Sequence, residues 1–242
     1  MLNQNTIDKL KELKLSGMLE AWTTVMQDDE HSSLSPTEFF GLMIDHEYIY
    51  RKNKKQHRLL SNAKLRYKSA CIEDISESNK NISRAHISKL KDLLWIKQQQ
   101  NIILTGPTGV GKTYIACAAA NIACRNGYSA RYYKLSNLIE LLKIAHADGS
   151  YLNLIAKITK FNSLIIDDWG IEQIPTARKN NILDIVDDFY QKGSLIITSQ
   201  LPVSSWHDYI DEPIIADAIL DRVINNSKII ELEGESLRKS ID

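Results

Sequence analysis

The chain has 242 residues, of which 43% are hydrophobic and 25% charged. This composition excludes wholesale disorder and fibrous repeats. The 30 Lys and Arg residues balance the 30 Asp and Glu residues, so net charge alone indicates no nucleic-acid partner. Three cysteines without a CxxC pair exclude a disulfide framework and a zinc knuckle, and they favour the cytoplasm. Every apolar stretch is shorter than the roughly 20 residues that span a bilayer, so we expect no membrane association.

The first hundred residues predict helices that are joined by short breaks. Apolar residues recur at helical spacing over residues 6–27, which predicts one helix there. Ser35 is a predicted N-cap, with Pro36 at the first helical position and Glu38 completing a capping box. We expect the helix that follows to continue into a basic segment. No strand pattern occurs before residue 100.

After residue 100, short apolar runs alternate with helical segments, which predicts a parallel sheet covered by helices on both faces. Five runs are predicted strands, at residues 101–105, 130–134, 163–167, 194–199 and 228–232. Predicted helices between them include residues 137–147, 177–191 and 213–225. A polar stretch at residues 73–84 separates the two patterns. We therefore predict a helical domain over residues 1–75 and an α/β domain over residues 76–242.

The octapeptide GPTGVGKT lies between the first predicted strand and a predicted helix, and it matches GxxxxGK followed by Ser or Thr. The glycines let the backbone curl, so that successive N–H groups point at phosphate oxygens, and the helix N-terminus adds positive potential. Lys112 would reach the outer phosphates and Thr113 would offer its hydroxyl to Mg²⁺. The motif predicts an ATP and Mg²⁺ site made by Gly106, Pro107, Thr108, Gly109, Val110, Gly111, Lys112 and Thr113.

Two carboxylates end the third predicted strand, in the run LIIDD. Asp167 is the predicted Mg²⁺ ligand. Asp168 is a candidate general base that orients the attacking water, which favours ATP hydrolysis over ATP binding alone. The alternative is that Asp168 only begins a turn. At the polar end of the fourth strand, Ser199 and Gln200 are candidates to contact the γ-phosphate, unless they simply begin a loop.

Cations are also needed near transferring phosphate charge, and two arginines near the end of the chain are candidates, Arg222 and Arg238. A separate group of eight cations lies within residues 51–68, where no Asp or Glu occurs. Interspersed Tyr and Leu residues give this segment an apolar side, so its charges would face outward and contact DNA phosphates independently of sequence. The alternative is a solvated helix face. The candidate DNA-binding residues are Arg51, Lys52, Lys54, Lys55, Arg58, Lys64, Arg66 and Lys68.

The runs GPTGVGKT, LIIDDWG, IITSQLP, ILDRV and GESLRK, in this order, resemble the IstB-type transposition helper ATPases, which are relatives of the DnaC helicase loaders in the AAA+ class. The N-terminal run LKLSGMLEAW also resembles that family, so the resemblance covers nearly the whole chain. It implies an AAA+ fold with a five-stranded parallel sheet, a small helical N-terminal domain and an extra helix within residues 149–161.

The resemblance also implies roles for single residues. Arg222 would be an arginine finger that reaches a neighbour's ATP, Arg238 the second sensor, and Ser199 or Gln200 the first sensor. A finger in trans implies ATP-dependent self-assembly, with double-stranded DNA held and bent and a transposase stimulated. The chain departs from the family in two places: DDFY stands where DDRY is frequent, and a full helical lid is missing after Arg238.

Three other functions remain open at this stage. A P-loop alone also suits a small-molecule kinase, although the paired carboxylates favour water as the acceptor. A replicative helicase loader would share the same core motifs. A passive scaffold would bind ATP without turning it over.

Overall fold

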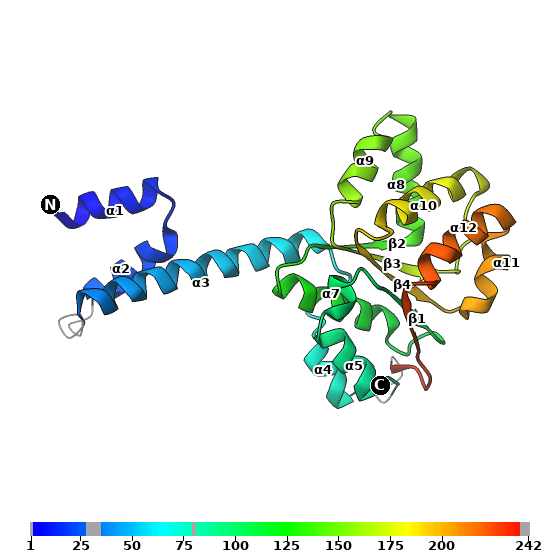
Figure 1. Cartoon of the computed structure of the whole chain (residues 1–242), viewed down its shortest axis with the longest axis horizontal. Coiled ribbons are helices and arrows are strands. Elements are labelled where there is room, and N and C mark those ends of the chain that lie inside the picture. The colour runs from blue at the N-terminus through cyan, green and yellow to red at the C-terminus, as the bar shows by residue number, and fades with distance from the viewer. Residues whose placement is uncertain (1, 28–34, 79–80, 238–242) are drawn as a thin grey trace. The chain divides into compact units, whose positions relative to one another are not determined.

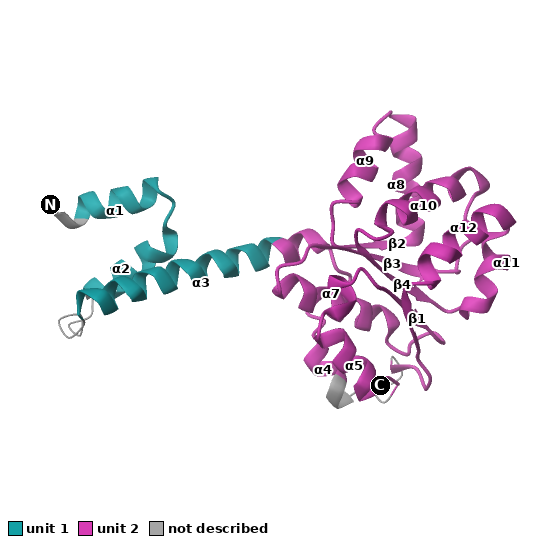
Figure 2. Cartoon of the chain, viewed as in Figure 1, with its two compact units in different colours: residues 1–58 teal, residues 59–242 magenta. Residues whose placement is uncertain are grey.

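The computed structural model describes residues 2–27, 35–78 and 81–237. The chain forms two compact units, Met1–Arg58 and Leu59–Asp242 (Figure 2). We expected the boundary after residue 75, whereas the units divide between Arg58 and Leu59. The physical reason is burial, because Leu65, Ile72 and Ile75 lie in the core of the second unit. Residues 59–75 thus pack as part of the α/β unit. Within the described ranges, no helix is long and apolar enough to cross a membrane.

The first unit consists of helices α1 (Leu2–Glu12), α2 (Ser16–Gln27) and most of α3 (Pro36–Ala63). The helix expected over residues 6–27 is two helices, because Lys14 has a left-handed backbone with a φ of 56°. The capping box is confirmed: the Glu38 N–H donates to Ser35 Oγ at 3.3 Å, and the Ser35 N–H donates to Glu38 Oε2 at 2.8 Å. These two bonds fix the start of α3.

A glycine lets α2 approach α3 closely. A Cβ added to Gly17 would lie 2.6 Å from the His46 carbonyl oxygen and 2.7 Å from the Glu47 Cα. The buried Glu47 carboxylate accepts the N–H groups of Gly17 at 2.7 Å and Met18 at 3.1 Å, so it satisfies the first turn of α2. Arg51 supplies the compensating charge, with its Nε 2.5 Å from Glu47 Oε1.

The second unit is built on a sheet of five parallel strands in the order β2-β3-β4-β1-β5 (Figure 1). The strands are β1 (Asn101–Thr105), β2 (Ala130–Lys134), β3 (Ser163–Trp169), β4 (Ser194–Ser199) and β5 (Ser227–Glu231). All five predicted strands are therefore present, although β3 continues two residues further than predicted and β5 lies one residue earlier. Among the described residues, no strand precedes residue 100.

Helices cover both faces of this sheet, as Figure 1 shows. One face carries α4 (Ile72–Ser78), α5 (Arg84–Lys91), α6 (Leu94–Lys97) and α7 (Lys112–Arg125). The other carries α8 (Leu135–Ala147), α9 (Tyr151–Ile158), α10 (Thr176–Phe189), α11 (Trp206–Ile210) and α12 (Pro213–Ile224). Residues of β1 alternate between the two cores, with Ile102 in one and Ile103 in the other. Helix α9 is the extra helix expected between the second and third strands.

The close contact at Gly17 yields a stability prediction. Gly17→Ala forces its new methyl group against the α3 backbone, and we expect a loss of about 1–3 kcal/mol for the first unit. The measurement is hydrogen exchange of peptides from α2 and α3, which should become faster. Gly41→Ala is the matched control, because it lies in α3 and its Cβ would meet nothing within 4 Å. It should slow exchange slightly, and equal behaviour of the two variants would contradict the prediction.

Candidate nucleotide-binding site

The GPTGVGKT loop connects β1 to α7 and adopts backbone angles that favour glycine. The φ angles are 137° at Gly106, 89° at Gly109 and 100° at Gly111, all in the region that side chains disfavour. A Cβ on Gly106 would lie 2.2 Å from the Leu232 carbonyl oxygen, so no larger residue fits there. Gly111 precedes the first residue of α7, so the loop ends at a helix N-terminus. Such a terminus offers N–H groups and positive potential to an anion.

The side chain of Lys112 folds back over this loop. Its Nζ donates to the carbonyl oxygens of Gly106 and Pro107, at 2.7 Å each, and the residue is buried. The two loop carbonyls thus hold the Lys112 ammonium against the P-loop backbone. It can therefore exchange these neutral acceptors for phosphate oxygens, which are stronger partners for a cation.

Asp167 is the central carboxylate of the site, and its side chain is fully buried on β3. Its Oδ1 accepts the hydroxyls of Thr113 at 2.8 Å and Thr198 at 2.5 Å. Its Oδ2 accepts the Tyr132 hydroxyl at 2.7 Å. Burial, followed by this bond to a carboxylate, raises the pKa of Tyr132. Helix α7 and strands β2 and β4 thus each bring a hydroxyl to one carboxylate.

The fourth partner of Asp167 is a guanidinium, which lies 3.7 Å from Oδ2 and belongs to Arg66. Contact with the Tyr132 hydroxyl is the main cause that raises the pKa of Arg66. Arg66 was predicted to bind DNA with the rest of the basic segment. In the structure it also lies beside the predicted Mg²⁺ ligand, with its side chain 45% exposed, and its contact with DNA stays a prediction.

Asp168 lies in an irregularity of the sheet that the sequence did not predict. The pairing of β3 with β4 shifts between Ile166 and Trp169, and Asp168 has a φ of 63°. Its N–H donates to the Thr198 hydroxyl at 3.1 Å, and its carboxylate lies 3.5 Å from Lys134 Nζ. Asp168 is therefore part of β3, with its carboxylate beside the cavity and paired with a lysine.

The two candidates at the end of the fourth strand, Ser199 and Gln200, differ in burial. Ser199 is buried, and its hydroxyl donates to the Trp169 carbonyl at 2.8 Å and accepts the Leu201 N–H at 3.0 Å. Gln200 is exposed at the cavity. The strand residue that reaches Asp167 is the preceding one, Thr198. Both candidates line the cavity, and their contact with a γ-phosphate stays a prediction.

A cavity of about 380 Å³ lies against the loop and is large enough for a nucleotide. Beyond the P-loop it is lined by Tyr67, Tyr114, Asp168, Thr198, Gln200 and Leu237, among others. Tyr67 and Tyr114 both line this cavity, and the centroids of their rings lie 5.9 Å apart. The segment after β5 also reaches the loop, where the Leu237 N–H donates to the Gly109 carbonyl at 3.0 Å.

Arg222 lies on α12 and does not line this cavity. It is ion-paired with Asp187 on α10, and its Nη1 donates to the Ala218 carbonyl at 2.8 Å. Phe189, which stands where the family often has an arginine, is buried in the core and supplies no cation. Arg238 lies outside the described residues.

The remaining basic residues keep their charges near solvent. Arg51, Lys52, Lys54, Lys55 and Arg58 are exposed on the part of α3 that belongs to the first unit. Lys64 and Lys68 are exposed in the second unit. Their binding to DNA stays a prediction.

Sequence reasoning missed four residues of the site, namely Arg66, Tyr132, Lys134 and Thr198. The hydroxyl of Thr198 precedes Ser199 directly, and strand alternation could have indicated it had the register of β4 been known. Tyr132 and Lys134 are two positions apart and therefore lie on the same side of β2, which weakly indicates that they could meet the same site. For Arg66 no local signal exists, because its partner is a hundred residues away in the chain.

The donor set suits Mg²⁺. Hydroxyl and carboxylate oxygens are its preferred protein ligands, and it is commonly held by one or two carboxylates together with substrate phosphates. Thr113 and Asp167 supply such oxygens side by side. Over the described residues no cluster of three or more His, Cys, Asp and Glu side chains forms a metal cage. The residues present thus fit a metal that arrives with a nucleotide.

Comparison with known proteins agrees with this site. Residues 8–241 match the family of IstB-like ATP binding proteins. The chain is 40% identical over 241 residues to the insertion sequence ATP-binding protein y4pL of Sinorhizobium fredii, across 99% of this chain and 98% of that protein. It is 41% identical over 206 residues to the ATP-binding protein of insertion sequence IS1162 of Pseudomonas fluorescens, across 85% and 89%.

Among solved structures, the crystal structure of the DnaC helicase loader superposes with a TM-score of 0.58 at 18% identity, covering 68% of this chain and 97% of that one. This likeness concerns the fold alone, and it agrees with the predicted arrangement of five parallel strands and flanking helices. The chain therefore belongs to the family of IstB-like ATP-binding proteins.

Proposed function

We propose that this chain is a cytoplasmic helper ATPase of DNA transposition. In this proposal it binds ATP with Mg²⁺, assembles with copies of itself on double-stranded DNA, bends that DNA, and recruits and stimulates a transposase. Hydrolysis of ATP then dismantles the assembly. The observation that carries the ATPase step is the convergence of the P-loop, Thr113 and the buried Asp167 beside a cavity of about 380 Å³. Membership of a family of insertion sequence proteins supports the transposition role.

The residues of the site divide the work of hydrolysis. The P-loop N–H groups and Lys112 bind the phosphates, which requires Lys112 to leave the carbonyls of Gly106 and Pro107. Thr113 and Asp167 would hold Mg²⁺, which neutralises phosphate charge during transfer. Asp168 faces the cavity and orients water as a general base, with Lys134 positioning its carboxylate.

The arginine finger belongs to a site that two copies of the chain share. Arg222 is 30% exposed and lies away from the cavity of its own chain, which supports a role at a neighbour's nucleotide. There it stabilises the charge that develops on the transferred phosphate. Within one chain, we propose Ser199 or Gln200 as the first sensor and Arg238 as the second.

The exposed cations of α3 are the proposed DNA contact. Helix positions four apart lie on one face, which applies to the pair Arg51 and Lys55 and to the pair Lys54 and Arg58. Together with Lys52, these side chains present several positive charges to a phosphate backbone. Lys64, Arg66 and Lys68 complete the proposed set. Such contacts carry no sequence information, which suits capture of target DNA of any sequence.

The shared site predicts different defects for two single changes. Lys112→Ala should lower nucleotide affinity about tenfold or more, because a charged hydrogen bond contributes roughly 1.5–3 kcal/mol. Arg222→Ala should bind nucleotide normally but lower the hydrolysis rate about a thousandfold. Neither variant should assemble on DNA with ATP, as measured by size-exclusion chromatography.

Asp187→Asn is the matched control for Arg222→Ala, because it weakens the same ion pair within the chain but keeps the guanidinium. It should hydrolyse ATP and assemble like the unmodified protein. Normal assembly of both the Lys112 and Arg222 variants would refute the shared site.

The DNA contact predicts a change in salt dependence. Replacing Lys52, Lys54 and Lys55 together by Gln should weaken DNA binding and reduce the slope of log affinity against log salt by about one per lost phosphate contact. The control replaces three exposed lysines on α8, on α9 and just after α9, namely Lys143, Lys157 and Lys160, by Gln. Fluorescence anisotropy with labelled duplexes measures both, and identical slopes in the two triple variants would exclude this segment as the contact.

The transposition role predicts the protein partner. Immobilised protein with ATP and DNA should retain the transposase of the same insertion sequence, and the protein should raise the strand-transfer yield of that transposase when the two are combined. Retention of the replicative helicase instead of the transposase would assign the chain to helicase loading.

A further inference from the structure

Arg66 stands apart from the other cations of the basic segment because it faces the nucleotide site. Its Nη1 lies 3.7 Å from Asp167 Oδ2, and its side chain remains 45% exposed while that of Asp167 is 0% exposed. One end of this ion pair thus lies in the protein interior, where screening by solvent and salt is weak.

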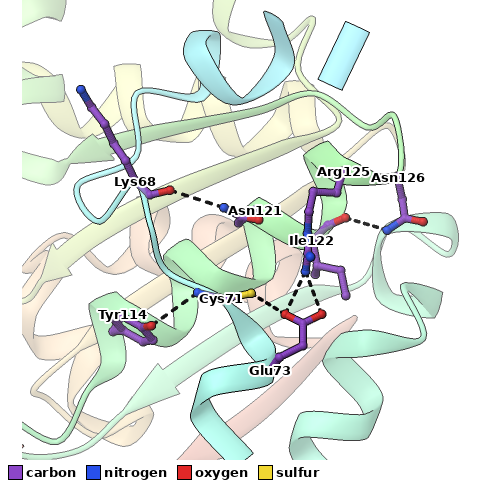
Figure 3. A network of polar contacts seen from close by, with 8 residues as sticks. All are labelled: Lys68, Cys71, Glu73, Tyr114, Asn121, Ile122, Arg125 and Asn126. Carbon is purple, nitrogen blue, oxygen red and sulfur yellow. Dashed lines mark hydrogen bonds and ion pairs between the residues drawn. The ribbon is translucent and has the colours of Figure 1, made fainter. Parts of the chain in front are cut away.

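The position of Arg66 is fixed by the segment that carries it. We call residues 64–73 the junction segment, because it follows α3 and leads into α4. Figure 3 shows how it is held along α7: the Asn121 Nδ2 donates to the Lys68 carbonyl at 3.5 Å, and the Cys71 N–H donates to the Tyr114 hydroxyl at 3.4 Å.

The end of the junction segment is held by charge. Arg125, at the end of α7, donates to both carboxylate oxygens of Glu73 at 2.9 Å, and the pKa of Glu73 is lowered to about 2, mainly by the Cys71 thiol and also by this arginine (Figure 3). Helix α7 begins at Lys112 of the P-loop. The segment that bears Arg66 is therefore attached to the same helix that bears Thr113.

Asp167 needs a cation for a physical reason. Its three hydroxyl partners, Thr113, Thr198 and Tyr132, donate hydrogen bonds but bring no charge. A fully buried carboxylate is costly to keep ionised unless a positive charge lies close to it. Over residues 2–27, 35–78 and 81–237, Arg66 is the cation that forms an ion pair with Asp167. A magnesium ion would bring a second positive charge to the same carboxylate.

We propose that Arg66 is the built-in counter-ion of Asp167 in the metal-free protein, and that it competes with Mg²⁺ for this carboxylate. Arg66 then sets how much Mg²⁺ the site requires before nucleotide is held tightly. Its half-exposed side chain can move outward when the metal enters, since its other end is already in solvent. This inference rests on the proposed Mg²⁺-nucleotide site, and it makes Arg66 a positioning residue for the metal rather than only a DNA contact.

The test is a Mg²⁺ titration of the full chain with a fluorescent ADP analogue at fixed concentration. Arg66→Gln should lower the half-saturating Mg²⁺ concentration by about three- to tenfold, because the competing charge is gone. Arg66→Lys should have a half-saturating Mg²⁺ concentration between those of Arg66→Gln and the unmodified protein, because lysine keeps a charge but lacks the planar guanidinium. Arg84→Gln, which removes an exposed arginine at the start of α5, should not change it.

A second measurement separates competition from a loss of structure. Without metal, Arg66→Gln should unfold at a lower temperature than the unmodified protein, because Asp167 has lost its counter-ion. Saturating Mg²⁺ and nucleotide should remove most of that difference.

A folded Arg66→Gln protein with an unchanged or higher Mg²⁺ requirement would overturn the proposal. If Arg66→Gln does not fold, an unchanged requirement in Arg66→Lys overturns it. Absence of Mg²⁺-dependent binding in the unmodified protein would instead refute the nucleotide site itself, and this proposal with it.

Discussion

The carboxylate of Asp167 is the constraint on which the site depends. It is buried at the carboxyl end of a central strand, where its oxygens have to be satisfied by groups from other elements. Tyr132 from β2, Thr198 from β4 and Thr113 from α7 meet this need. Ligands of open α/β sheets bind at this edge, beyond the carboxyl ends of the strands. One buried charge therefore aligns three elements of the fold around the place where phosphate and metal would bind.

The shift in pairing at Asp168 gives the two adjacent carboxylates separate environments. In a regular strand, neighbouring side chains point to opposite faces, so a second carboxylate would turn away from the site. Asp168 instead has a left-handed backbone, lines the cavity and places its carboxylate 3.5 Å from Lys134 Nζ. The same shift pairs Trp169 with Ser199 and occupies the Ser199 hydroxyl with a backbone carbonyl. Asp167 is thus bound by hydroxyl groups and Arg66, whereas Asp168 is paired with Lys134.

Local chemistry explains what the sequence predicted well. The P-loop, the five strands and the capping box at Ser35 depend on residues that are close in the chain, and each appears where its pattern indicated. The pairing of β3 with β4, the contact of Arg66 with Asp167 and the unit boundary depend on residues far apart. Charge patterning grouped Arg66 with the other exposed cations, and it could not indicate the ion pair of Arg66 with Asp167 because it depends on composition alone. Similarly, the polar stretch at residues 73–84 indicated a linker, although Ile75 and Ile82 within it are buried in the α/β core.

The boundary at Arg58 changes what counts as the ATPase unit. Residues 59–75 contribute Leu65, Ile72 and Ile75 to the core under α7, and Tyr67 to the wall of the cavity. A unit that began at residue 76 would lose these side chains and leave the buried Asp167 without its ion-pair partner. The sequence between the basic part of α3 and the first strand is thus a structural component of the nucleotide site. Because α3 continues across the boundary to Ala63, the helix that carries the exposed cations of the first unit also leads directly into the segment that carries Arg66, whose guanidinium lies beside Asp167.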